Sequence, residues 1–351
     1  MKVGLLQIFQ NHGSALSDSR MWEEEIEMGL LAEELGFDSL WSVEHHFRDY
    51  AACPDNLQYL SYMAARTRRI TLATGAVILP WNDPLRVAEK LSMLDHLSGG
   101  RALFGMGRGL ARREYAGFGM DMSTSRDRFD EAADMILDAM DTGFIEGRGP
   151  HYPQARTEIR PRPRAGFRDR VYAIAMSPDS VDAAARIGAG MAVFSQAPWE
   201  MQAEAMNRYR EAFRARHGRP APPPITADMI VCHEDRRRAE ELAQKHLMGY
   251  LVTVFDHYEL KSEHFKQAKG YEMYAQAADI LRDIGLETVA ESYLQVNAWG
   301  TPQDIRDKLV KRREIIGDFS LNACFRMAGI SREDAVHGMR LFAEKVLPAL
   351  R

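Results

Sequence analysis

Two adjacent histidines follow a carboxylate in the segment Glu44-His45-His46, directly after an apolar run at 38–43 that predicts a β-strand. Imidazole titrates near neutral pH, so a histidine here is a candidate general acid or base. The three side chains could also bind a metal, but consecutive residues at a strand end diverge, and no further ligands follow at a recognisable spacing. The segment therefore predicts one catalytic imidazole and no metal site, with a hydrogen-bonded structural histidine as the alternative.

A second group of residues could bind an anion. Arg108 lies among glycines in Gly105-Met106-Gly107-Arg108-Gly109-Leu110, where backbone and guanidinium can approach an anion together. Arg126 follows at a predicted helix start, and Ser177-Pro178-Asp179-Ser180 offers hydroxyls and free N–H groups at another. Each piece alone is also typical of a solvated arginine or an ordinary helix cap. Together they predict a site for a phosphorylated ligand.

Other signals are weaker. Gly75 in Thr74-Gly75-Ala76-Val77 indicates a strand bulge or a close approach by a ligand, although packing against a neighbour explains it equally simply. The remaining histidines considered show no usable pattern: His233, His246, His257, His264 and His337.

Alternating elements position these residues. Apolar runs predict strands at 2–8, 38–43, 70–79, 102–106, 171–175, 192–194, 225–232 and 320–326, and amphipathic patterns predict helices between them, for example at 20–36, 56–66, 84–98, 125–142 and 331–350. Eight strand–helix units predict a (β/α)8 TIM barrel, in which active-site groups follow the carboxyl ends of the strands. A doubly wound sheet is the competing fold, but the first strand has no glycine-rich turn after it.

Three stretches exceed the strand–helix unit. Residues 144–164 are rich in Pro, Gly and Arg and predict a surface hairpin, and 221–224 is a proline-rich connection. Residues 256–297 are long and polar and come after the seventh strand, so we expect a late insertion that forms a lid loop. The chain is otherwise expected to be one domain over residues 1–351.

Composition limits the class of protein. The 351 residues are 46% hydrophobic and 27% charged, as in globular proteins, and the net charge of −5 argues against a nucleic-acid binder. Apolar runs are too short for a membrane helix, and the N-terminus has no signal-peptide pattern. Cys53, Cys232 and Cys324 have no C-x-x-C spacing, so neither a disulfide framework nor a zinc site is expected. We expect a cytoplasmic protein that binds neither membrane nor nucleic acid.

Several motifs, in matching order and spacing, cover almost the whole chain: 42–47, 78–80, 84–89, 94–101, 107–110, 118–121, 125–126, 300–302 and 339–350. In this combination the sequence resembles the bacterial luciferase family, and its α subunit more than distant members. The resemblance implies a (β/α)8 barrel that binds reduced FMN from a separate flavin reductase. It also implies an FMNH2-dependent monooxygenase, with O2 as co-substrate reacting through a flavin 4a-hydroperoxide.

The resemblance also implies residue roles. His45 matches the catalytic histidine, and the phosphate contacts match Arg108, Arg126, Ser177 and Ser180, with Leu110 and Met176 beside them. Gly75-Ala76 matches a non-prolyl cis peptide beneath the isoalloxazine ring. The 256–297 insertion, with Lys269 and Tyr271, matches the mobile active-site loop. His46, one residue after His45, is expected to point the other way and to be structural.

Departures from the family pattern affect the substrate. Gly107 replaces a reactive cysteine, Gln196 a tryptophan, Met176 a glutamate and Glu114 an aspartate of the luciferase α subunit. These changes put a long-chain aldehyde and light emission in doubt, and the abundance of Ala and Arg suggests a source in which such enzymes modify polyketides. Alternatives are an F420-dependent oxidoreductase on the same barrel and a non-catalytic flavin-binding subunit, although the retained His45 argues against the latter.

A homodimer is also expected from the sequence. The second and third barrel helices carry more apolar residues than one barrel flank should need, and the family pairs subunits in this region. These residues are Leu57, Leu60, Met63, Leu91, Met93 and Leu94.

Overall fold

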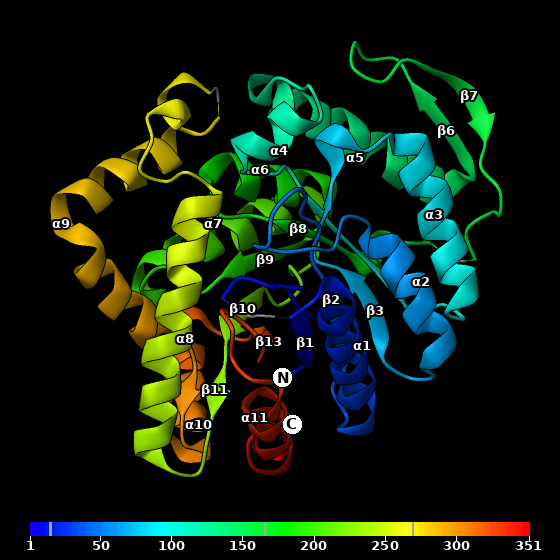
Figure 1. The fold of residues 1–351 in the computed structure, drawn as a ribbon. Coiled ribbons are helices and arrows are strands. Elements are labelled where there is room, and N and C mark those ends of the chain that lie inside the picture. Colours follow the sequence, from blue (N-terminus) through cyan, green and yellow to red (C-terminus); the bar gives the residue numbers. More distant parts are fainter. Residues whose placement is uncertain (14–15, 165, 269) are drawn as a thin grey trace.

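The computed structural model describes residues 1–13, 16–164, 166–268 and 270–351. Parallel strands form a closed barrel with helices around it, which confirms the predicted (β/α)8 fold (Figure 1). In the described residues the sheet has the order β3-β2-β1-β13-β10-β9-β8-β5-β4, and pairing of β3 with β5 closes it. The barrel strands are β1 Val3–Gln7, β2 Ser39–Ser42, β3 Thr71–Thr74, β5 Ala102–Gly107, β8 Val171–Ile174, β9 Gly190–Phe194, β10 Ile225–Met229 and β13 Ser320–Cys324.

Helices follow the strands on the outside of the barrel. The α-helices are α1 Asp18–Glu34, α2 Asn56–Arg66, α3 Pro84–Leu97, α4 Arg112–Gly117, α5 Ser125–Thr142, α6 Pro178–Ile187, α7 Trp199–His217, α8 Arg236–His257, α9 Glu272–Val296, α10 Pro302–Ile316, α11 Arg332–Lys345 and α12 Leu347–Leu350. Short 3-10 turns are η1 Leu79–Trp81, η2 Met122–Thr124, η3 Arg168–Arg170 and η4 His264–Gln267. The two ends of the chain meet below the barrel, where the amino group of Met1 donates to the carbonyl oxygen of Leu350 at 2.8 Å (Figure 1).

The strand predicted at 70–79 is broken, and this prediction was wrong in its extent. β3 ends at Thr74, and β4, Val77–Ile78, pairs only with β5 before the turn η1 begins. Hydrogen bonds hold the break open: the N–H of Gly75 donates to Ser42 O at 2.7 Å, and Asn56 Nδ2 donates to Ala76 O at 3.0 Å. The predicted strand 225–232 is likewise divided, because β11, Val231–Cys232, pairs with β12, Trp299–Gly300, outside the barrel.

The two long insertions differ in form. Residues 144–164 contain the predicted hairpin, with β6 Phe144–Gly147 antiparallel to β7 Gln154–Glu158. The 256–297 stretch is not a plain loop, because most of it is the helix α9, which lies along one side of the barrel (Figure 1). Gly285, with a φ of 80° and a ψ of 160°, interrupts this helix, and buried Ala290, Tyr293 and Val296 anchor the part that follows it.

Among the described residues, no helix is both long enough and apolar enough to cross a membrane.

Candidate active site

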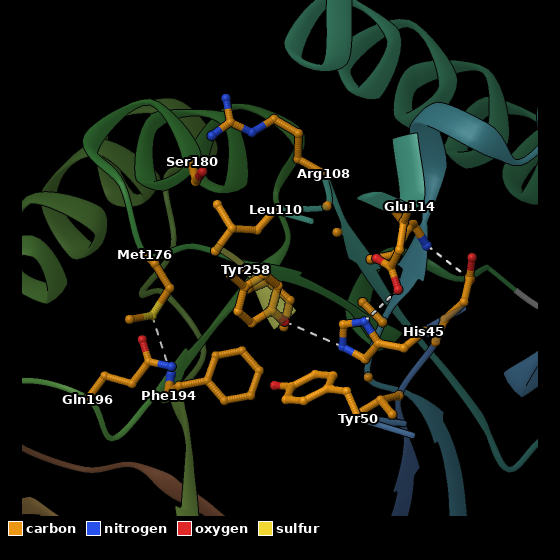
Figure 2. Close-up of a pocket in the computed structure, with 18 of the residues that line it drawn as sticks. His45, Tyr50, Arg108, Leu110, Glu114, Met176, Ser180, Phe194, Gln196 and Tyr258 are labelled. Atoms are coloured by element: carbon orange, nitrogen blue, oxygen red, sulfur yellow. Dashed lines mark hydrogen bonds and ion pairs between the residues drawn. The ribbon is translucent and has the colours of Figure 1, made fainter. Parts of the chain in front are cut away.

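A cavity opens where the barrel strands end, as the barrel architecture leads one to expect (Figure 2). Most of the predicted site residues line it: His45, Gly75, Ala76, Arg108, Leu110, Glu114, Met176, Ser180 and Gln196. Arg126, Ser177 and Tyr271 do not line the cavity but contact residues that do. Lys269 lies outside the described residues.

His45 is held at the cavity wall by contacts from three elements. Its backbone N–H donates to Cys53 O at 3.1 Å, which fixes the chain just beyond β2. Its ring nitrogen Nδ1 lies 3.0 Å from Oε1 of Glu114 on α4, and Nε2 lies 3.4 Å from the hydroxyl of Tyr258 after α8 (Figure 2). Because the two contacts use opposite ring nitrogens, the imidazole has a defined orientation.

The charge of Glu114 selects the tautomer of His45. Burial by itself raises the pKa of the Glu114 carboxyl, but the charge of His45 and contacts with His257 and His45 outweigh burial and hold the pKa well below its ordinary value. An ionised carboxylate only accepts hydrogen bonds, so Nδ1 of His45 donates its hydrogen to Glu114. In neutral His45 the lone pair is therefore on Nε2, which can take a proton from a group in the cavity and return it.

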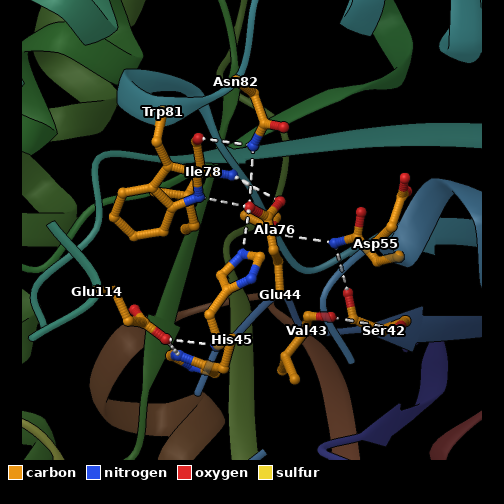
Figure 3. A network of polar contacts seen from close by, with 12 residues as sticks. Ser42, Val43, Glu44, His45, Asp55, Ala76, Ile78, Trp81, Asn82 and Glu114 are labelled. Atoms are coloured by element: carbon orange, nitrogen blue, oxygen red, sulfur yellow. Dashed lines mark hydrogen bonds and ion pairs between the residues drawn. The ribbon is translucent and has the colours of Figure 1, made fainter. Parts of the chain in front are cut away.

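The neighbouring Glu44 faces away from His45 and has a structural role (Figure 3). Its Oε1 accepts hydrogen bonds from Trp81 Nε1 at 2.7 Å and Asn82 Nδ2 at 2.9 Å, and its Oε2 accepts from the N–H of Ile78 at 3.1 Å. Nε2 of His46 lies 3.3 Å from the same Oε1. Glu44 and His46 thus brace the chain after β4, and the three consecutive side chains do not converge on one point.

Two histidines from different elements, His45 and His257, lie close to the carboxylate of Glu114. His257, at the end of α8, places Nε2 3.6 Å from Oε1 of Glu114, and the ligand atoms of His45, Glu114 and His257 all lie within 4.8 Å of one another. Three such groups are within reach of a metal ion, but Oε1 already accepts the hydrogens of His45 Nδ1 and the His46 backbone at 3.0 and 2.8 Å. This is hydrogen-bonding geometry, so we assign no metal here.

A cradle for an anion lies across the cavity from His45 and joins helices α5 and α6. Arg126 Nη2 donates to the hydroxyl of Ser180 at 3.0 Å, and that hydroxyl lies 2.8 Å from the hydroxyl of Ser177. Ser177 is the N-cap of α6, with Pro178 in the first turn, so the free N–H groups of the helix start face the same region. Residues from two strand ends therefore converge as predicted.

Arg108 completes the cradle from the end of β5. Its guanidinium lies 4.0 Å from the ring centre of Tyr271, and its Nη2 donates to Gly270 O at 2.8 Å, so the insertion closes over this arginine. Buried Nη1 of Arg108 and buried Nε of Arg126 find no acceptor among the described residues. Burial and the nearby charge of Arg108 lower the pKa of Arg126. Two buried cations with unused donors fit a phosphate group.

Glycines at the end of β5 and just after it let Ile78 pack closely beside this cradle. A Cβ atom at Gly107 would lie 2.9 Å from Ile78 Cδ1, and Gly109 has a φ of +84°, which side chains rarely adopt. The peptide bond between Gly75 and Ala76 is cis, as the sequence resemblance implies, and both residues line the cavity.

A model of the luciferase-like monooxygenase family matches residues 1–318. The chain belongs to this family. It is 25% identical over 353 residues to an alkanal monooxygenase alpha chain of Photorhabdus luminescens, a match that covers 95% of this chain and 94% of that one. The barrel fold and the family therefore agree.

This luciferase-like monooxygenase superposes on solved structures of other proteins. It superposes on the monooxygenase RslO1 from Streptomyces bottropensis with a TM-score of 0.80 and 29% identity, covering 100% of both chains. An F420-dependent secondary alcohol dehydrogenase, 16% identical, also superposes with a TM-score of 0.73 over 100% of this chain and 99% of that one. At that identity the likeness shows the fold alone, so the barrel itself does not distinguish a flavin from a deazaflavin.

Sequence reasoning missed five aromatic side chains in the cavity wall of this luciferase-like monooxygenase. The residues concerned are Tyr50, Phe194, Tyr250, Tyr258 and Tyr274. Tyr50 and Phe194 lie near strand ends, which was an available signal. The others come from α8, the residue after it and α9, where a helical pattern does not show which face meets the cavity.

The positions that depart from the family pattern lie in the same wall. Met176 and Gln196 both line the cavity, and the backbone N–H of Phe194 lies 3.3 Å from the sulfur of Met176. Glu114 also lines the cavity, and its Oε1 lies 3.0 Å from Nδ1 of His45.

The apolar residues of α2 and α3, from which a dimer was predicted, do not form a surface in this luciferase-like monooxygenase. Five of the six apolar residues on which it rested are buried within the chain, and only Met93 is exposed, at 45%. The five contribute to the barrel's own core and cannot also form an interface.

Proposed function

We propose that this chain is the oxygenase component of a two-component, FMN-dependent monooxygenase. Its substrates are reduced FMN, supplied by a separate flavin reductase, O2 and a small organic molecule that receives one oxygen atom. The observation that carries this proposal is the pair of buried arginines with unused donors, Arg108 and Arg126, at one end of a cavity whose other wall holds His45. A cofactor with a phosphate tail would fit the cradle, and His45 lines the same cavity.

When bound, reduced FMN supplies the electrons that activate O2, and this chemistry belongs to the cofactor. The protein would bind the cofactor and orient it. Arg108, Arg126, Ser177 and Ser180 would hold the phosphate through charge-assisted hydrogen bonds. Gly75 and Ala76 line the same cavity and would contact the ring system.

His45 would manage protons at its Nε2. Glu114 fixes the hydrogen on Nδ1, so Nε2 of neutral His45 accepts a proton, and the resulting imidazolium beside Glu114 can return it. The aromatic wall excludes water from this region, which strengthens electrostatic interactions inside it. Tyr258 also lines the cavity, and its hydroxyl lies 3.4 Å from Nε2 of His45.

The proposed substrate class follows from the aromatic side chains that line the cavity. Tyr50, Phe194 and Tyr250 favour a ligand with aromatic or extended apolar surface, such as a polyketide, over a simple alkyl chain. We also propose that the enzyme is a homodimer, as the family resemblance implies.

Oxygen uptake tests the proposal. Purified protein with FMN, NADH, a flavin reductase and a panel of aldehydes, ketones and aromatic polyketides should consume O2 and release an oxygenated product. Substrate turnover with reduced F420 in the absence of O2 would favour the alternative hydride-transfer enzyme. Binding of FMN without turnover of any substrate would favour a non-catalytic subunit.

A further inference from the structure

The side chain of His257 is an unexplained buried polar group. It is 2% exposed, and neither ring nitrogen has a hydrogen-bond partner among the described residues. Its ring stacks on Tyr50 at a centroid distance of 4.1 Å and an interplanar angle of 11°. Buried polar atoms are almost always hydrogen-bonded, and a phenylalanine would stack equally well. Packing on Tyr50 therefore does not explain why a histidine, with its two ring nitrogens, occupies this position.

The groups around His257 come from three elements. From α4, the Glu114 carboxylate lies 3.6 Å from Nε2. Burial lowers the pKa of His257, the charges of His45 and Arg113 lower it further, and Glu114 raises it. Arg113 is itself paired with Asp256 and Glu259. From the loop after β2, the ring of His45 lies edge-on at 5.0 Å, and the hydroxyl of Tyr50 is engaged by that of Tyr250 at 3.1 Å. Tyr258, next in sequence, packs edge-on at 4.8 Å. Glu114 is the one anion that the described residues place against His257.

Glu114 is thus shared by two imidazoles, of which His45 has the shorter contact. If His45 carries an extra proton, the three groups together are neutral. If both imidazoles carry one, the set has a net positive charge in a buried site, which is unfavourable. One carboxylate therefore supports one imidazolium at a time.

We propose that His257 is a positioning residue for His45: by sharing the Glu114 carboxylate, it limits the two imidazoles to a single added proton and weakens the hold of Glu114 on a proton at His45. Its value for turnover rests on the proposed function, in which His45 exchanges protons with groups in the cavity. The arrangement itself is a property of the folded chain and can be measured without cofactor.

Histidine titration by NMR tests this directly. Protein labelled with 13C at histidine Cε1, kept in EDTA to remove metal ions, is titrated with His45 and His257 assigned from their variants. In the wild type, His45 should take up its proton first and His257 only at lower pH, as coupled sites do. Two independent curves with one shared midpoint, or His257 charging before His45, would overturn the proposal.

Substitutions at position 257 separate coupling from packing. His257→Phe keeps the stack on Tyr50 but releases Glu114 to His45 alone, so the His45 midpoint should rise by about one pH unit. His257→Gln retains an N–H donor near the Nε2 position and should raise the midpoint less. The matched control is His246→Phe, a buried histidine on the same helix whose Nδ1 lies 3.0 Å from Ala328 O; it should leave the midpoint unchanged. An unchanged midpoint in both 257 variants would show a packing role only.

The outcomes keep the two proposals apart. If oxygen-dependent turnover is absent but the His45 midpoint moves as described, the proposed function fails and the shared carboxylate stands. If turnover occurs, the midpoint of its pH profile should move upward in His257→Phe by the same amount as the NMR midpoint. A loss of rate without such a shift would overturn the positioning role.

Discussion

Arg126 donates a hydrogen bond to the hydroxyl of Ser180 at 3.0 Å, although the two residues lie 54 positions apart on separate helices. The contact ties the start of α5 to the start of α6 and leaves the buried Nε of Arg126 without an acceptor among the described residues. Arg108 approaches the same region from β5. The residues of this site come from adjacent strand–helix units, so the barrel fixes their positions relative to one another.

His45 should be required for chemistry but not for cofactor binding. His45→Ala removes the acid–base group while leaving the phosphate cradle on other strands intact, so FMNH2 affinity should change little. Coupled product formation should fall by about 10²–10⁴-fold, with the oxygen released as H2O2 instead. Product yield, H2O2 and FMNH2 affinity are measured together.

His46→Ala is the matched control for that experiment. His46 contacts Glu44 rather than the cavity, so its variant should mainly lower the melting temperature. A folded His45→Ala protein with full, coupled turnover would remove His45 from the mechanism.

The ionised state of Glu114 should make stability depend on pH. Burial opposes its ionisation, but the contacts with His45 and His257 lower its pKa below the ordinary 4.5, so the carboxylate stabilises the fold above that pH and loses this contribution as the pH falls further. Glu114→Gln should therefore melt at a lower temperature than the wild type at pH 7, and the gap should narrow below about pH 4.5. Melting curves from pH 7 to 3 measure it, and a gap that stays constant would contradict the assignment.

A buried ion pair between the barrel strand β10 and the helix α10 should matter for stability. Arg312 is paired with Asp228 at 2.5 Å, both side chains are almost completely buried, and Ser195 Oγ donates to the same carboxylate at 2.7 Å. Asp228→Asn leaves an unpaired buried cation and should lower the free energy of unfolding by about 3–5 kcal/mol. Urea unfolding measures this loss.

The neighbouring pair supplies the control. Arg313 and Asp318 also form an ion pair, but their side chains are 60% and 70% exposed, so Asp318→Asn should cost at most about 1 kcal/mol. Equal effects of the two substitutions would mean that burial of the Asp228 pair is irrelevant to stability.

Light scattering at micromolar concentration should give the mass of a dimer, about twice the 39.8 kDa of the chain. Most of the apolar residues from which the dimer was predicted are buried within the chain. The exposed Tyr62, Met93 and Leu97 on α2 and α3 are therefore the residues to substitute in a test of the interface. A strictly monomeric protein would refute the homodimer.

Local sequence patterns predicted the parts of the molecule that depend on local order. Continuous apolar runs predicted the barrel strands, and residues just beyond them, such as His45 and Arg108, lie at the cavity. The break after β3 was missed because it depends on Glu44 and Asn56, which reach it from other elements. The contact of Glu114 with His45, 69 residues away, exists only once the barrel closes. His257 was missed for the same reason.

Anaerobic equilibrium binding of reduced FMN tests the central claim most directly. Wild-type protein should bind FMNH2 more tightly than oxidised FMN, and Arg108→Ala should weaken FMNH2 binding by about 10- to 100-fold, the value of a lost charge-assisted contact of about 1.5–3 kcal/mol. Arg128→Ala is the control, because Arg128 Nε is engaged by Thr124 Oγ1 at 3.1 Å and does not line the cavity; its affinity should equal that of the wild type. Reduced F420 bound far more tightly than FMNH2, or an Arg108→Ala protein with unchanged affinity, would contradict the account.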